Sequence, residues 1–128
     1  MSLKNSLTRM TKSLHILADL YDCGGDETFF THKGIVKRKV LAMVKRAGFR
    51  IVASRFHKFG ANAGITGVII VSESHLTLHT WPEKGFVNLD VFFCNYTQDN
   101  TKKVRNILRE FKTLYNPGKI RKREVWRD

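Results

Sequence analysis

Residues 75–94 read HLTLHTWPEKGFVNLDVFFC and contain two segments in which apolar and polar side chains alternate. Leu76 and Leu78 alternate with polar or aromatic residues in the first segment, and Val87, Leu89 and Val91 do so in the second. This period of two predicts strands over 75–81 and 86–94. The other face of these strands, opposite the leucines and valines, is neither apolar enough for a core nor polar enough for an ordinary surface. This face is therefore predicted to hold a site or to contact a partner. It carries His79, Trp81, Asn88, Asp90, Phe92 and Cys94.

Further strands are predicted on both sides of this pair. Residues 11–21 and 50–59 alternate in the same way, and residues 66–72 are strongly apolar and β-branched. Residues 119–127 can form a last, highly charged strand, and we expect it at a sheet edge, where lysines discourage mis-pairing.

Two segments have helical periodicity instead. Over 27–47, Val36, Val40 and Val44 recur every four residues, with basic residues on the other face and Gly48 at the end. Over 99–115 an apolar stripe is clearer, Asp99 or Asn100 is a candidate N-cap, and Asn-Pro-Gly at 116–118 ends the helix. The stripe consists of Val104, Ile107, Leu108, Phe111, Leu114 and Tyr115.

The predicted order is strand, helix, a run of strands, helix, strand. This order predicts an α+β fold, a two-layer sandwich with both helices on one face of a mainly antiparallel sheet. The length of 128 residues suits a single domain spanning 1–128, with a loose basic arm over about 1–11.

The composition is that of an ordinary globular protein, with 42% hydrophobic and 27% charged residues. No apolar run approaches a membrane span and no signal peptide is visible, so no membrane partner is expected. Cys23 and Cys94 form no CxxC motif, and we expect free thiols in a cytoplasmic protein. The formal net charge of +12 raises nucleic acid as a partner, although a solvated basic surface is the favoured interpretation.

The segment SESHLTLHTWPE at 72–83 concentrates groups that could carry chemistry. His75 and His79 are four residues apart, which on a strand corresponds to about 13 Å. Two ligands at that distance cannot share one zinc ion, so no metal site is predicted. The sequence contains no GxSxG elbow, so a serine hydrolase is not indicated. From the residues alone, a half-buried strand with two satisfied histidines is the favoured interpretation.

The chain nevertheless resembles the bacterial and archaeal S-adenosylmethionine decarboxylases over residues 12–115. The resemblance is carried by several motifs in order. They are SLHILADLYDC at 13–23, FHKF at 56–59, GITGVII at 64–70, SESHLTLHTWPE at 72–83 and DVFFC at 90–94.

That family implies a proenzyme, or zymogen, that cleaves itself between Glu73 and Ser74 into 1–73 and 74–128. The Ser74 hydroxyl would attack the Glu73 carbonyl to give an ester, and elimination would leave a pyruvoyl group derived from Ser74. This cofactor would form a Schiff base with the substrate amine and accept electrons as CO2 leaves, which makes the protein a carbon–carbon lyase of spermidine biosynthesis.

The resemblance also implies roles for individual positions. His79 would remove a proton during processing, Thr66 would assist with its hydroxyl, and Cys94 would return a proton after decarboxylation. Phe59 and Trp81 would sandwich the adenine ring of S-adenosylmethionine, and Glu83 would bind the ribose hydroxyls. A homodimer is implied, with two sheets face to face in a four-layer α/β/β/α sandwich and active sites drawn from both protomers.

Three residues or features depart from the family pattern. Thr66 stands where serine is usual, Lys84 where an aromatic residue is frequent, and the basic balance would not steer a cationic substrate inward. Two alternatives therefore stay open. One is the same pyruvoyl fold acting on arginine or ornithine, and the other is an unprocessed relative that binds nucleic acid.

Overall fold

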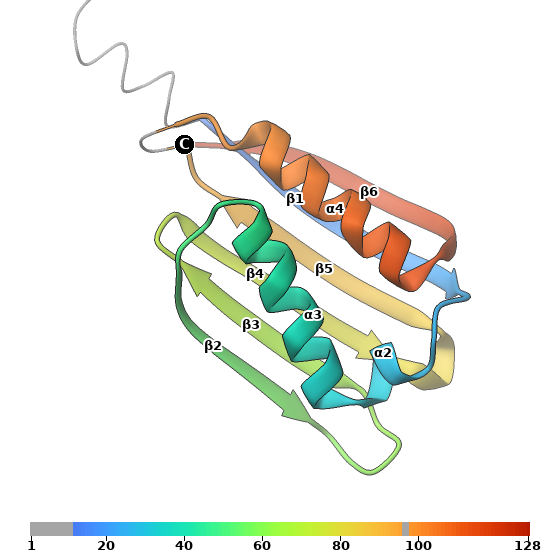
Figure 1. Cartoon of the computed structure of the whole chain (residues 1–128). Helices are drawn as coiled ribbons and strands as arrows, with labels where there is room; N and C mark the ends of the chain where they lie inside the picture. The colour runs from blue at the N-terminus through green and yellow to red at the C-terminus, as the bar shows by residue number, and fades with distance from the viewer. Residues whose placement is uncertain (1–11, 96–97) are drawn as a thin grey trace, which may run out of the picture.

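The computed structural model of the chain describes residues 12–95 and 98–128 (Figure 1). The basic arm predicted over 1–11 lies outside the described residues. The elements are β1 (Ser13–Cys23), α2 (Thr28–Thr31), α3 (Lys33–Arg46), β2 (Ile51–Lys58), β3 (Ile65–Val71), β4 (Ser74–Trp81), a 3-10 turn (Pro82–Lys84), β5 (Phe86–Phe93), α4 (Thr101–Tyr115) and β6 (Pro117–Arg127).

The strands form one six-stranded sheet in the order β2-β3-β4-β5-β1-β6. All five neighbouring pairs are antiparallel. Helices α3 and α4 lie side by side on one face of the sheet (Figure 1). The predicted α+β sandwich is confirmed, and the charged last strand is an edge strand as predicted.

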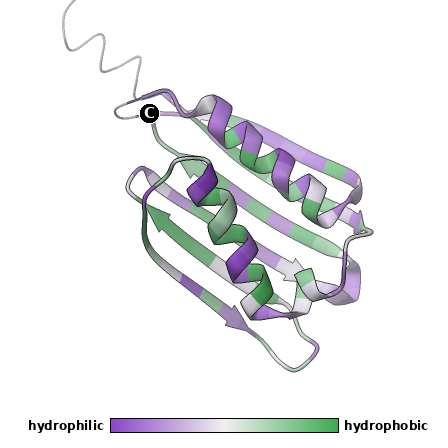
Figure 2. Ribbon diagram, in the orientation of Figure 1, coloured by the Kyte–Doolittle hydropathy of each residue, from purple (hydrophilic) through white to green (hydrophobic). Residues whose placement is uncertain are grey.

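The core lies between the sheet and the two helices. Residues of one parity along each central strand point into it, and the apolar stripes of the helices meet them, so that hydrophobic and hydrophilic positions alternate along the ribbon (Figure 2). Burying these side chains is the main driving force for the fold. Fully buried members include Leu14, Ile16, Leu20, Val36, Val40, Val44, Leu76, Val91, Phe93, Ile107, Phe111 and Tyr115.

The first helical segment differs from the prediction. The continuous helix expected over 27–47 is interrupted at His32, whose backbone is extended (φ −96°, ψ 97°). The imidazole Nδ1 of His32 accepts a hydrogen bond from the Ile35 amide at 3.2 Å. His32 thus caps a new helix, α3, and the periodicity of Val36, Val40 and Val44 could not reveal that break.

The start of α4 ties the helical layer to the end of β5. Asn100 is buried, and its side-chain amide donates to the Cys94 carbonyl at 3.0 Å. The backbone N–H of Asn100 donates to Asn95 Oδ1 at 2.7 Å. Asp99 accepts a hydrogen bond from the Thr101 backbone amide at 2.9 Å, which satisfies one N–H of the first helical turn. Asn100 occupies the predicted N-cap position but makes no side-chain cap hydrogen bond. No helix among the described residues is long and apolar enough to cross a membrane.

Gly64 marks a close approach of two backbones before β3. A Cβ there would lie 1.9 Å from the Thr80 carbonyl oxygen, whereas one on Gly60 would meet only the Ala63 Cβ, at 3.4 Å. We therefore expect Gly64→Ala to lower the free energy of unfolding by about 2–3 kcal/mol, because backbone must move. Gly60→Ala should change it by less than about 0.5 kcal/mol. Urea denaturation measures both, and equal losses would contradict the contact.

Candidate functional site

The turn between β3 and β4 holds a peptide bond in an unusual conformation. Val71 pairs with Ser74 across this tight hairpin, and Ser74 has φ 152°, a value that residues with side chains rarely adopt. The Glu73 carbonyl oxygen accepts a hydrogen bond from the Cys94 amide at 2.9 Å. The predicted cleavage residues Glu73 and Ser74 and the predicted acid Cys94 therefore lie together.

The register of the central strands creates this grouping. Ser74 stands opposite Phe93 in the β4–β5 pair, so the next residue, Cys94, reaches the turn. An N–H aimed at a carbonyl oxygen stabilises negative charge that develops there when a nucleophile attacks the carbon. The Glu73 carbonyl is thus polarised by the Cys94 N–H and followed by a residue with a rarely adopted backbone conformation.

A second cluster lies at the other end of β4. Phe59, His79, Trp81 and Glu83 line a hollow of about 230 Å³. His79 lies between the two aromatic side chains, with its ring centroid 4.7 Å from that of Trp81 and 6.1 Å from that of Phe59. Its Nδ1 is hydrogen-bonded to the Thr66 hydroxyl. The structure therefore groups all three predicted substrate-binding residues with His79 and Thr66.

Two residues that the sequence reasoning did not assign hold this cluster in place. Asn88 accepts from the Trp81 indole N–H at 2.8 Å and donates to Asp19 at 2.8 Å, which fixes the orientation of the indole. Thr80 is buried, accepts from the Ile65 amide and donates to the Phe30 carbonyl, both at 2.8 Å. The sequence could have indicated Thr80 through its position in the strand alternation, since it is a polar residue on the same face as Leu76 and Leu78.

The two clusters are separated along one strand. Ser74 and His79 are five residues apart on β4, which corresponds to about 16 Å at the rise of an extended chain. A side chain spans only a fraction of that distance. Within one chain, the structure does not bring the predicted processing pair, His79 and Thr66, to the Glu73–Ser74 peptide.

Beside Ser74 lies a network of histidines that sequence reasoning also left unassigned. The Ser74 hydroxyl is 2.9 Å from His75 Nδ1. The His75 ring makes edge contacts with His15 and Phe92, at centroid distances of 6.4 and 6.2 Å. His15 Nε2 is bound to Asp90, and Arg127 approaches its Nδ1 at 3.4 Å. These residues share the open face of the sheet, so their parity was the signal that pointed to them.

Burial perturbs two groups outside these clusters. Desolvation, followed by the charge of Asp22, raises the pKa of the Cys23 thiol to about 11. Desolvation also raises the pKa of Tyr115, whose hydroxyl donates to the Phe29 carbonyl at 2.7 Å. Both cysteines are free thiols. In residues 12–95 and 98–128, no three His, Cys, Asp or Glu side chains form a metal-binding group.

Comparison with known proteins finds similar sequences over most of the chain. Residues 14–128 match the family model described as S-adenosylmethionine decarboxylase. The S-adenosylmethionine decarboxylase proenzyme of Carboxydothermus hydrogenoformans is 40% identical over 114 residues, which cover 87% of this chain and 85% of that protein. The corresponding proenzyme of Sulfurihydrogenibium sp. is 39% identical over 115 residues, covering 90% of this chain and 84% of that protein.

A solved structure is similar over nearly the whole fold. The crystal structure of the adenosylmethionine decarboxylase from Aquifex aeolicus VF5 superposes with a TM-score of 0.76 at 32% identity. The match covers 90% of this chain and 89% of the Aquifex chain.

Proposed function

Because the chain belongs to the S-adenosylmethionine decarboxylase family, we propose that it is a self-processing, pyruvoyl-dependent lyase. Its substrate is S-adenosylmethionine, and its products are decarboxylated S-adenosylmethionine and CO2. The observation that carries the proposal is the Glu73–Ser74 peptide, which combines a strained Ser74 with a carbonyl that accepts the Cys94 N–H.

Processing begins with an acyl shift at that peptide. The Ser74 oxygen attacks the Glu73 carbonyl carbon, and the negative charge that develops on the carbonyl oxygen is stabilised by the Cys94 amide. The C–N bond then breaks and the amine gains a proton, which leaves Glu73 esterified to Ser74. Strain at Ser74 favours this step because the rearrangement relieves it.

The second processing step is the elimination that cleaves the ester, and it needs a base at Ser74. A second copy of the chain can supply this base. His79 and Thr66 lie about 16 Å from Ser74 in their own chain. Two sheets packed face to face and antiparallel would place His79 of one protomer near Ser74 of the other. The open face also exposes Leu17, Ile70 and Val125, which suits burial in a homodimer. We therefore propose a homodimer with two shared active sites.

The hollow around His79 suits the nucleoside part of the substrate. The Phe59 ring is 61% exposed and free to contact a flat ligand, while the indole of Trp81 is fixed by Asn88. Aromatic faces attract flat and cationic groups, and the Glu83 carboxylate can accept hydrogen bonds from ribose hydroxyls. Lys84, which replaces the usual aromatic residue, lies 5.3 Å from the Trp81 ring centroid. Phe59, Trp81 and Glu83 favour S-adenosylmethionine over arginine or ornithine, whereas the Lys84 ammonium does not contribute to this preference.

The Glu73–Ser74 turn also fits the cofactor it would produce. A pyruvoyl group derived from Ser74 supplies a carbonyl that binds the substrate amine and accepts electrons during decarboxylation. Cys94 follows Phe93, which stands opposite position 74, and this proximity supports the proposal that its thiol returns a proton there. The product would feed spermidine biosynthesis. Because both cysteines are free thiols, we propose the cytoplasm as the location.

Intact mass under denaturing conditions tests the processing step. The wild-type chain should give two fragments, one ending at Glu73 and one beginning with the pyruvoyl group at position 74. Ser74→Ala should stay a single chain and release no CO2 from S-adenosylmethionine, because it lacks the nucleophile. Ser72→Ala, in the same turn, is the matched control and should still be cleaved. A wild-type chain that stays whole on long incubation would refute the proposal.

Complementation between variants tests whether the site is shared. Ser74→Ala and His79→Ala should each remain whole when expressed alone. In co-expressed heterodimers, the His79→Ala chain should be cleaved, because its Ser74 faces the intact His79 of its partner. A double Ser74→Ala/His79→Ala chain is the control and should not rescue it. Heterodimers in which neither chain is cleaved would place the whole site within one protomer.

A further inference from the structure

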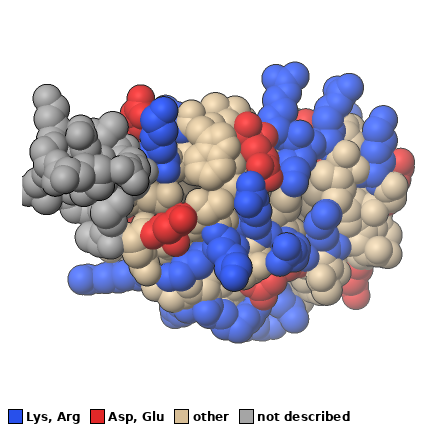
Figure 3. All heavy atoms as spheres, turned by 90° about the horizontal axis from the view of Figure 1, so that it is seen from above, with Lys and Arg blue, Asp and Glu red and all other residues tan. Residues whose placement is uncertain are grey.

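The helical face, which we define as the outer surface of α3 and α4, carries most of the excess positive charge of the molecule. The two helices contain eleven basic residues and one acidic residue, Glu110. The surplus of Lys and Arg on the surface is visible in Figure 3. The basic residues are Lys33, Lys37, Arg38, Lys39, Lys45, Arg46, Lys102, Lys103, Arg105, Arg109 and Lys112.

Few of these charges are neutralised. Among the described residues, Arg46 pairs with Glu110 and Arg105 with Glu124, and no other cation of the two helices forms an ion pair. Ten of the eleven side chains are exposed, and only Lys103 is half-buried. Like charges at this density repel one another, so a folded surface of this kind is stabilised by a bound anion.

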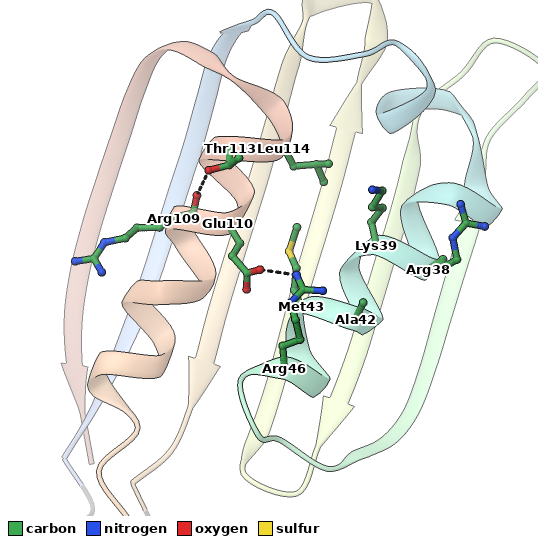
Figure 4. Close-up of a pocket in the computed structure, with 9 residues that line it drawn as sticks. All are labelled: Arg38, Lys39, Ala42, Met43, Arg46, Arg109, Glu110, Thr113 and Leu114. Carbon is green, nitrogen blue, oxygen red and sulfur yellow. Dashed lines mark hydrogen bonds and ion pairs between the residues drawn. The ribbon is translucent and has the colours of Figure 1, made fainter.

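The two helices enclose a hollow of about 530 Å³ between them. Its floor is apolar and includes Ala42, Met43 and Leu114. The Arg46–Glu110 pair crosses it, while Arg109 extends from α4 away from α3 (Figure 4). The cations are therefore distributed across both helices rather than focused on one point.

We propose that the helical face binds the phosphate backbone of double-stranded nucleic acid without sequence preference. Each helix is about 21 Å long, so its cations can meet several phosphates of a regularly charged polymer. A protein partner usually packs on exposed apolar side chains, but the apolar floor of the hollow is recessed, and none of the large exposed hydrophobic side chains of the described residues lies on α3 or α4. The same lack of exposed aromatic rings disfavours single strands, which bind by base stacking.

Fluorescence anisotropy with a labelled 20-base-pair DNA duplex, in 50 to 200 mM KCl, tests this proposal. Binding should weaken steeply with salt and be equal for two unrelated sequences. The triple variant Arg38→Glu/Lys39→Glu/Arg109→Glu should bind the duplex at least tenfold more weakly. The slope of log binding constant against log salt concentration should become shallower by about three, because three phosphate contacts are lost.

The triple variant Lys12→Glu/Arg50→Glu/Lys119→Glu is the matched control. Both triple variants have a formal charge of +6, but the control leaves the helical face intact and should lose less than about threefold. Equal losses, or no binding at 50 mM KCl, would overturn the proposal. The proposal would also be overturned if polyglutamate displaced the labelled duplex at a lower concentration of charge than unlabelled duplex does, because this would indicate an acidic protein partner.

An independent observation concerns His75 and rests on the proposed function. The Ser74 hydroxyl lies 2.9 Å from His75 Nδ1, and with the imidazole proton on Nε2 the hydroxyl donates to that nitrogen. We infer that His75 is the base for the acyl shift. It takes the Ser74 hydroxyl proton as the oxygen attacks the Glu73 carbonyl carbon, and it returns the proton to the departing amine. The His75 ring contacts His15 and Phe92, and His15 is in turn bound to Asp90 and approached by Arg127.

Hydroxylamine separates this role from that of His79, because it cleaves esters and leaves amides intact. His79→Ala should accumulate the ester and be cut by hydroxylamine at Glu73. His75→Asn should stay whole and resist hydroxylamine, with at least a tenfold slower acyl shift, although asparagine can still accept the Ser74 hydrogen bond. His75→Asn that is processed at the wild-type rate would refute the role of His75, whereas a wild-type chain that is never processed would refute the proposed function. Circular dichroism checks that each variant is folded.

Discussion

The burial of one face of the sheet beneath α3 and α4 is the constraint on which the rest of the molecule depends. Strand side chains alternate with a period of two, so a slip of one residue in β4 would expose Leu76 and Leu78 and bury the imidazoles of His75 and His79. The cost of both changes fixes the register. That register sets Phe93 opposite Ser74 and delivers the Cys94 amide to the Glu73 carbonyl. Packing on the covered face therefore determines chemistry at the edge of the open one.

The open face is organised along the length of β4. The turn with the unusual Ser74 backbone lies at its start, and an aromatic hollow with a histidine–hydroxyl pair lies at its end. A strand is too stiff to fold one end onto the other, so a single chain can hold both halves of a site without joining them. The proposed face-to-face association would join them without any change in fold, and it would also cover the apolar side chains that the open face leaves exposed.

The charge distribution separates the two faces further. The open face mixes His, Asp, Asn and aromatic residues in specific hydrogen bonds, whereas the helical face carries cations with few partners. Charge on the helical face lies across the thickness of the sandwich from the hollow around His79, so it would affect a cationic ligand bound there less than the net charge of +12 suggests. The departure from the usual family composition is thus compatible with the proposed chemistry.

The sequence by itself determined the elements and the layers. Periods of two and of about 3.6 residues report directly which side chains can be buried together, and they located six strands, α4 and the end of α3 to within about two residues. They could not locate the break at His32, because an extended residue between two helical turns leaves the apolar spacing intact. The motifs named the residues of the site, and their spacing along a strand already separates Ser74 from His79 by about 16 Å. Only the tertiary structure decided that Glu73 and Cys94 meet, because the pairing of β4 with β5, and not the order of residues, sets which groups approach one another.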